Sequence, residues 1–303
     1  QLYTGYSAPL AWRDYGFTSY PLAVSNIPAR LYGSLLTEAV NRQNPKLIVV
    51  DIDGFLTDED PEKLEANLRK WLDNMPCSRN KMETIRTCVP AELQTSFYFN
   101  IAKYHANWYQ PDTWLPVQQR LRAMDKTGYS LTKSFEAIGQ SLTDADEPDS
   151  RPLTLSGANA QYLRDFCAQA RSLGTNVLFL RMPHRTQTTD PNVFADVAAV
   201  VGGYGYELLD LHDAFDTIGL DRCADFMDSD HLNAIGMETF TAWFGQYLSE
   251  HYDLTTAHSE TVTAEWQRCA DFMAQILPTC QQQAADNTKQ TLNEFSAAFD
   301  AYR

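Results

Sequence analysis

The sequence lacks several features that would assign a function directly. No apolar run is long enough to cross a bilayer, and the first residues do not combine a basic segment with an apolar stretch, so no anchor or signal peptide is recognisable. Basic residues are scarce: 24 Lys and Arg stand against 39 Asp and Glu, which gives a formal net charge of -15. Because nucleic acid and anionic membranes would repel such a chain, we expect neither as a partner.

Cysteine is also sparse, and its spacing is uninformative. The six cysteines contain no CxxC pair and no cluster with histidine, which argues against structural zinc. Their even number permits disulfides, and therefore export, but reduced thiols fit a chain of this length equally well. The candidate pairs are Cys77 with Cys88 and Cys269 with Cys280. Cys167 falls on the apolar side of a predicted helix, where it is expected to serve packing.

What the sequence does contain is enough apolar material for one large α/β domain, with 44% hydrophobic residues in 303. Apolar runs alternate with helical periodicity, which predicts a doubly wound parallel sheet in a three-layer α/β/α sandwich. Functional sites are then expected at the carboxyl ends of the strands. The predicted strands are 18–24, 47–52, 176–183 and 206–211, and the helices between them are 28–41, 156–173 and 192–201.

Two helical segments extend this single domain of residues 1–303. Helical patterns at 61–74, 80–87 and 91–109 predict an insertion over about 58–135. After the domain's last helix, a polar segment of about 252–303 predicts one or two surface helices around Trp266, Phe272 and Leu277.

The most informative stretch is 223–233, a short polar loop before an amphipathic helix. Asp228 stands three residues before His231, a spacing that lets the carboxylate fold back onto the imidazole and hold one tautomer, leaving the other nitrogen as a base. Asn233 can cap the helix, whose apolar face would fix the loop against the core. An isolated Asp-x-x-His is more often an ordinary loop, so its context decides.

That context resembles a known family. The run from Asp225 to Gly236, continuing to Thr241, is similar to the last conserved block of SGNH (GDSL-like) hydrolases, closest to a bacterial cell-surface branch that works in O-acylation of envelope polysaccharides and teichoic acids. The resemblance implies that Asp228 and His231 are the acid and base of a Ser-His-Asp triad. Asp230 is not at a matching position.

The nucleophile is less clear. Gly5-Tyr6-Ser7 offers a serine, but too few residues precede it to form a buried central strand. The stretch 10–16 resembles the branch's Leu-x-Trp-x-x-Tyr-Gly, about a dozen residues after its nucleophile, which places the serine and the first strand just ahead of Gln1. Ser7 is the fallback candidate.

Other resemblances supply candidate binding residues. The family's oxyanion block corresponds to 24–28, where Asn26 replaces the usual glycine and, with Ser25, is the candidate oxyanion donor. In the insertion, 73–81 and 104–108 resemble motifs of the branch, and His105 and Trp108 are candidates for a sugar-binding cleft, although packing is the more common role of such side chains. Asn233 is a further candidate for substrate contact.

A competing signal lies at residues 47–58, which resemble the first motif of haloacid-dehalogenase-type phosphatases. By that analogy Asp51 would attack phosphorus and Asp53 would act as acid/base beside Mg²⁺. Phe55 stands where a threonine is usual, and no lysine occurs between Lys133 and Lys289 to bind phosphate, although Arg181 could replace it.

The sequence therefore predicts a serine esterase or O-acyltransferase that acts on acyl (acetyl) esters of an extracellular or cell-envelope polysaccharide, and this chemistry needs no metal or cofactor. The expected location is extracellular or at the cell surface, tethered through a segment before residue 1, with a membrane acyltransferase as a possible partner. The alternatives are the Mg²⁺-dependent phosphatase and a non-catalytic glycan-binding relic of an SGNH hydrolase.

Overall fold

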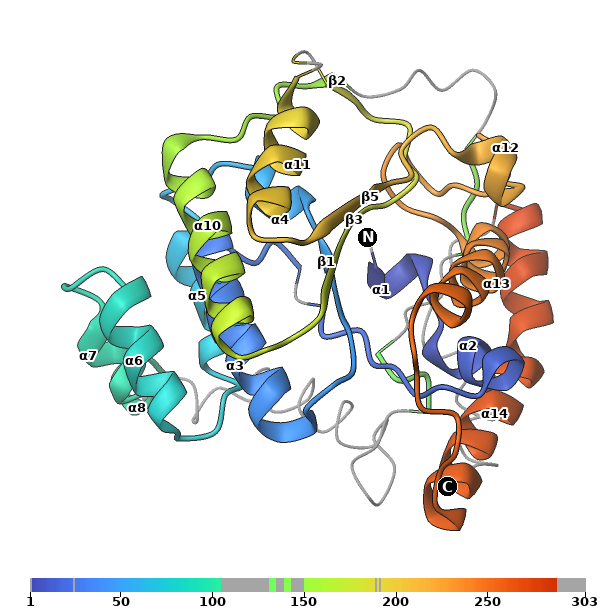
Figure 1. Cartoon of the computed structure of the whole chain (residues 1–303), viewed down its shortest axis with the longest axis horizontal. Coiled ribbons are helices and arrows are strands. Elements are labelled where there is room, and N and C mark those ends of the chain that lie inside the picture. The colour runs from blue at the N-terminus through green and yellow to red at the C-terminus, as the bar shows by residue number, and fades with distance from the viewer. Residues whose placement is uncertain are drawn as a thin grey trace.

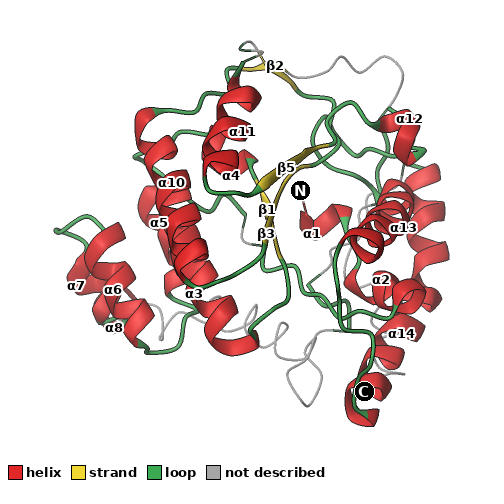
Figure 2. Cartoon of the chain, viewed as in Figure 1, coloured by secondary structure: helices red, strands yellow, loops and turns green. Residues whose placement is uncertain are grey.

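The computed structural model describes residues 2–23, 25–104, 131–134, 139–142, 150–188, 190 and 192–287. Within these residues the chain is mainly helical, and its strands are confined to the middle of the molecule and one end (Figure 2). The main sheet has three parallel strands in the spatial order β1 (Ile48–Asp51), β3 (Val177–Arg181) and β5 (Glu207–Asp210). All three occupy predicted strand segments. A second, two-stranded parallel sheet pairs β2 (Ser150–Arg151) with β4 (Gln187–Thr188).

The fourth predicted strand, 18–24, is wrong for the residues that the structure describes. Residues 18–23 form no strand. Pro21 has no N–H to give to a ladder, and Tyr20 and Leu22 are 51% and 41% exposed. The β-branched and aromatic composition of this segment therefore did not lead to strand pairing.

Strand β3 is the centre of the sheet and is buried along its whole length. Val177 and Phe179 pack into one hydrophobic cluster and Leu178 and Leu180 into another, because successive side chains of a strand point to opposite faces. Helices gather on both sides of the strands (Figure 1). On the Phe179 side they are η1 (Ala29–Leu31), α3 (Tyr32–Gln43), α4 (Asp53–Leu56), α10 (Gly157–Ser172) and α11 (Val193–Gly203).

On the Leu178 side lie α1 (Leu2–Gly5), α2 (Ala8–Tyr15), α12 (Phe215–Ile218), α13 (Ala234–His251) and α14 (Glu260–Ala285). The predicted extension is therefore not a surface appendage. Trp266, Phe272 and Leu277 are all buried, because α14 packs against α2 and α13. Its many polar residues lie on the outer face of a helix whose other face completes the core.

The predicted insertion is mainly helical over residues 64–104, and its described residues 131–134 form a turn. It contains α5 (Leu64–Leu72), α6 (Arg79–Cys88), α7 (Gln94–Tyr98) and α8 (Ile101–Tyr104). Helices α6, α7 and α8 lie at the left of Figure 1, away from the strands. A satellite cluster joins α5, α6 and α7 to the main body through Leu31 of η1, with Leu68, Ile85 and Phe97 among its members. The expected helix 91–109 is interrupted between α7 and α8.

Neither predicted disulfide is present. Cys269 and Cys280 both lie in α14, eleven residues apart, which separates them by about 16 Å at 1.5 Å per residue. Cys88 is the last residue of α6, whereas Cys77 stands just before the Ser78 cap at the other end of this ten-residue helix, about 14 Å away along its axis, and a disulfide needs Cα atoms within about 7 Å. The prediction for Cys167 is confirmed, since it is fully buried in the Phe179 cluster.

Candidate functional site

The loop that carries Asp228 and His231 is a small hairpin. Phe226 and Leu232 form an antiparallel bridge, and the Met227 N–H donates to the His231 carbonyl at 2.8 Å. The base of the hairpin packs tightly on the start of α13, because a Cβ at Gly236 would lie 2.3 Å from the carbonyl oxygen of Asp225. Only glycine fits at this position, and the buried helix therefore fixes the hairpin in place.

At the tip of the hairpin, the predicted pair is formed. His231 Nδ1 lies 2.9 Å from Oδ1 and 3.0 Å from Oδ2 of Asp228. Asp228 Oδ1 also accepts the backbone N–H groups of Asp230 and His231, each at 2.8 Å. Burial would raise the pKa of Asp228, but the hydrogen bonds from the His231 ring and these two backbone groups outweigh it and lower the pKa.

An ionised carboxylate facing Nδ1 makes that nitrogen the donor and leaves Nε2 with its lone pair. Nε2 has no hydrogen-bond partner among the described residues, and 27% of the His231 side chain is exposed. The Asp228–His231 dyad is thus oriented and accessible, as a general base must be.

The dyad lies at the edge of the sheet where all three main strands end. Asp51, Arg181 and Asp210 are the last residues of β1, β3 and β5, and the charge of His231 acts on Asp51. The segment that follows β3 contacts the tip of the hairpin directly, through Arg185 N–H and the carbonyl of Ser229 at 2.6 Å. This is the edge at which the sequence predicts a site.

The two acids of the competing motif lie at the same edge. Asp53 opens the short helix α4, and its N–H donates to Asp51 Oδ1 at 3.1 Å. Part of Asp53 is accessible, but its Oδ1 is buried without a hydrogen-bond partner among the described residues. Burial and then the charge of Asp51 raise the pKa of Asp53 to about 8, and burial raises the pKa of Asp51.

With no cation beside them, these carboxyls hold a proton between them at neutral pH, and Mg²⁺, whose ligands must be ionised, would have to displace it. In the described part of the chain, no group of three or more His, Cys, Asp or Glu side chains is placed to hold a metal ion. Mg²⁺ would therefore meet two acidic side chains at this point, Asp51 and Asp53, without a third such donor placed beside them among the described residues.

The fallback nucleophile is not brought to the dyad. Ser7 is fully buried just before α2, and its N–H donates to Thr241 Oγ1 of α13 at 3.0 Å. Its hydroxyl has no hydrogen-bond partner among the described residues, so it makes no bond to His231. The packing of α2 against α13 places this serine in the core.

The candidate oxyanion residues form an exposed turn. Lys70 of α5 donates to the carbonyl oxygen of Ser25 at 3.0 Å, which ties the turn to the insertion. Asn26 has a φ of 55°, in the left-handed region where glycine is usual, so asparagine can replace the family's glycine in conformation. No described hydrogen bond links either residue to His231.

Asn233 has a structural role instead of the expected substrate contact. Its Oδ1 accepts the N–H groups of Ile235 and Gly236, and its Nδ2 donates to Ser141 Oγ and to the carbonyl of Ala224. The residue is fully buried: its Oδ1 caps α13, and its Nδ2 joins the hairpin to the Ser141 segment. His105 and Trp108 lie outside the described residues.

Sequence reasoning missed other residues at this edge. His184 and His212 follow β3 and β5 by three and two residues, and their rings meet edge to face with centroids 4.6 Å apart. Burial, followed by the neighbouring His212 and Arg181, lowers the pKa of His184 to about 3, so its ring is neutral. Their position just after strand ends was the available signal.

Arg151 and Thr186, which contact Asp230, carried no such signal, because they are 79 and 44 residues away from it in the chain.

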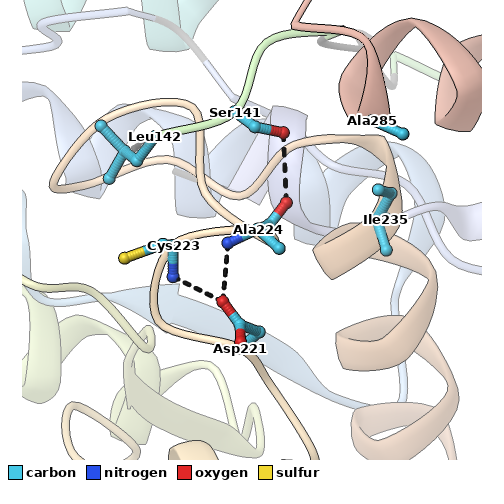
Figure 3. Close-up of a pocket in the computed structure, with 7 residues that line it drawn as sticks. All are labelled: Ser141, Leu142, Asp221, Cys223, Ala224, Ile235 and Ala285. Atoms are coloured by element: carbon cyan, nitrogen blue, oxygen red, sulfur yellow. Dashed lines mark hydrogen bonds between the residues drawn. The ribbon is translucent and has the colours of Figure 1, made fainter. Parts of the chain in front are cut away.

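A hollow of about 530 Å³ opens at the base of the hairpin (Figure 3). Asp221 faces the backbone of Cys223 and Ala224 and accepts both of their N–H groups, which lowers its pKa. The dyad does not line this hollow. Its lining residues are Ser141, Leu142, Asp221, Cys223, Ala224, Ile235 and Ala285.

No protein-family model, curated protein or solved structure matches the chain. None of the described helices is both long and apolar enough to span a membrane.

Proposed function

We propose that this chain is a serine esterase or O-acyltransferase of SGNH type that acts on acyl esters, such as acetyl esters, of an extracellular or cell-envelope polysaccharide. The observation that carries the proposal is the contact of His231 Nδ1 with both carboxylate oxygens of Asp228, with Nε2 accessible. An orienting carboxylate behind an imidazole is the arrangement that activates a hydroxyl nucleophile.

The fold supports this proposal. Helices pack on both sides of the parallel strands, as a three-layer α/β/α sandwich requires, and the dyad follows the last strand of the sheet. Among the described residues β1 is an edge strand that pairs only with β3. The proposal requires a nucleophilic serine close to His231 Nε2, for which a strand at this edge would be a suitable carrier.

In the proposed mechanism, His231 Nε2 removes the proton from the serine hydroxyl as its oxygen attacks the ester carbonyl. The imidazolium that forms is stabilised by Asp228 and then gives the proton to the departing sugar oxygen, which leaves an acyl-enzyme. A second acceptor then gives its proton to Nε2 as it attacks the acyl group. Water as acceptor makes an esterase, and a sugar hydroxyl makes an acyltransferase.

The test is covalent labelling of the protein, including whatever segment precedes Gln1, with a fluorophosphonate probe followed by intact mass measurement. We expect one adduct on the wild type and none on His231→Ala. Asp228→Asn should slow labelling by about 10²- to 10⁴-fold, the scale for a wrongly held histidine. His251→Ala is the matched control, because this exposed histidine lies at the far end of α13.

Full labelling of His231→Ala would refute the assignment of the base. Peptide mapping of the adduct decides between Ser7 and a serine before Gln1. No adduct on the wild type would favour the glycan-binding module.

One observation favours a second candidate, the phosphatase. A protonated Asp53 beside Asp51 at neutral pH is the form that can protonate a leaving group. Its test is Mg²⁺-dependent release of phosphate from an aryl phosphate, abolished in Asp51→Asn.

A further inference from the structure

Asp230 is one of the residues through which the tip of the hairpin is attached to the rest of the molecule. Its carboxylate is buried, and it is held on both oxygens: Thr186 Oγ1 donates to Oδ1 and the Arg151 guanidinium donates to Oδ2. The sequence resemblance gives this acid no role. Its two partners come from strand β2 and from the segment between β3 and β4.

The backbone beside Asp230 is held by the same segment. The carbonyl of Ser229 accepts the N–H groups of Arg185 at 2.6 Å and Thr186 at 3.2 Å. The N–H of Asp230 donates in turn to Asp228 Oδ1 at 2.8 Å. Holding Asp230 in place therefore also holds its backbone N–H, which is one of the donors that orient the Asp228 carboxylate toward the His231 ring.

Charge explains why the partner of Asp230 is an arginine. Asp230 acts electrostatically on both Asp51 and Asp53, so this edge of the sheet concentrates negative charge. The positive charge of Arg151 partly compensates this negative charge from the solvent side, because the Arg151 side chain is 51% exposed and that of Asp230 is 10% exposed. The pairing of β2 with β4, with Arg151 opposite Thr188, holds the arginine next to the Thr186 segment.

We infer that Asp230, clamped by Arg151 and Thr186, is a positioning residue that holds Asp228 in line with His231 Nδ1. The inference rests on the proposed function only for its effect on catalysis. The geometric effect, one imidazole tautomer held at His231, is independent of which reaction the dyad performs.

The first test uses activity on an acyl ester. Asp230→Ala should lower kcat by about 10- to 100-fold, the cost of a small misplacement, with KM within about threefold. In an Asp228→Asn background the same change should add no further loss, because Asp230 acts through Asp228. If Asp230 served only general stability, Asp230→Ala would lower kcat by the same factor in the wild type and in Asp228→Asn. That result would overturn the inference.

The arginine is tested by a graded pair. Arg151→Met should reduce kcat in the same direction as Asp230→Ala, and Arg151→Lys should restore part of it, since a lysine keeps the charge but not the planar fork. Arg171→Met is the matched control, because Arg171 is exposed on α10 away from this edge. Equal losses in the Arg151→Met and Arg171→Met proteins would overturn the role of Arg151.

The second test needs no turnover. Nitrogen NMR of the imidazole rings should show His231 in a single Nδ1–H tautomer in the wild type, with its signals identified by their absence in His231→Gln. In Asp230→Ala or, if that variant does not fold, in Asp230→Asn, a mixture of tautomers is expected. An unchanged His231 spectrum in a folded variant overturns the inference, whereas an inactive wild type with the expected spectra refutes only the proposed function.

Discussion

Replacing Asn233 by alanine gives a direct measure of how the structure holds the dyad. The side chain makes four hydrogen bonds, two as acceptor at the start of α13 and two as donor, from a position with no exposed surface. Loss of the cap costs about 1 kcal/mol. The two buried hydrogen bonds on the donor side add about 1 kcal/mol more.

We therefore expect Asn233→Ala to lower the free energy of unfolding by about 2 kcal/mol. Urea unfolding followed by far-ultraviolet circular dichroism measures it, and a shift of roughly 1 M in the midpoint is expected for a slope of about 2–3 kcal/mol per molar. Asn192→Ala is the matched control: Asn192 also precedes a helix, α11, but its exposed side chain makes no capping bond.

An unchanged midpoint in Asn233→Ala, or an equal loss in Asn192→Ala, would refute the structural role. A raised KM without loss of stability would instead restore the substrate contact expected from the sequence.

Two further predictions concern titration and thiol chemistry. Because the pKa of Asp53 is raised from 3.8 to about 8, the folded state keeps a proton that the unfolded chain releases, so this contribution to stability is complete below pH 4 and is lost as the pH rises through 8. Asp53→Asn, which keeps the neutral form, should match the wild type near pH 4 and be more stable than it near pH 9 in urea unfolding; equal stability at both pH values would contradict the raised pKa. Iodoacetamide should modify exposed Cys77 first and Cys167 only on unfolding, because burial raises the pKa of Cys167 to about 12. Peptide mass mapping follows this order, and early modification of Cys167 would contradict its placement in the core.

The sequence was most informative where local pattern and burial agree. The run at 47–52 is apolar and β-branched, and it becomes β1 because both of its faces meet helices. Asp228 and His231 were predictable because three residues of loop suffice to bring them together, and the apolar face of α13 anchors the loop.

The remaining features depend on contacts between distant segments. The segment 18–23 has the composition of a strand, but a strand needs a partner, and the described residues give it none. The roles of α14 and Asp230 follow from what packs beside them, which residue order does not reveal. Asn233 looked equally suited to a cap and to a substrate contact, and only its full burial decides between them.

The hairpin closed at its base and held at its tip has a consequence for ligand binding. The backbone N–H groups of Met227, Asp230, His231 and Asn233 all donate within the hairpin, and the carbonyl of Ser229 accepts from outside it. Amide hydrogens in such a loop should exchange with solvent only when a larger part of the fold opens. A ligand that reaches His231 therefore meets a loop that has already lost its conformational freedom during folding, and binding carries little further entropic cost from ordering it.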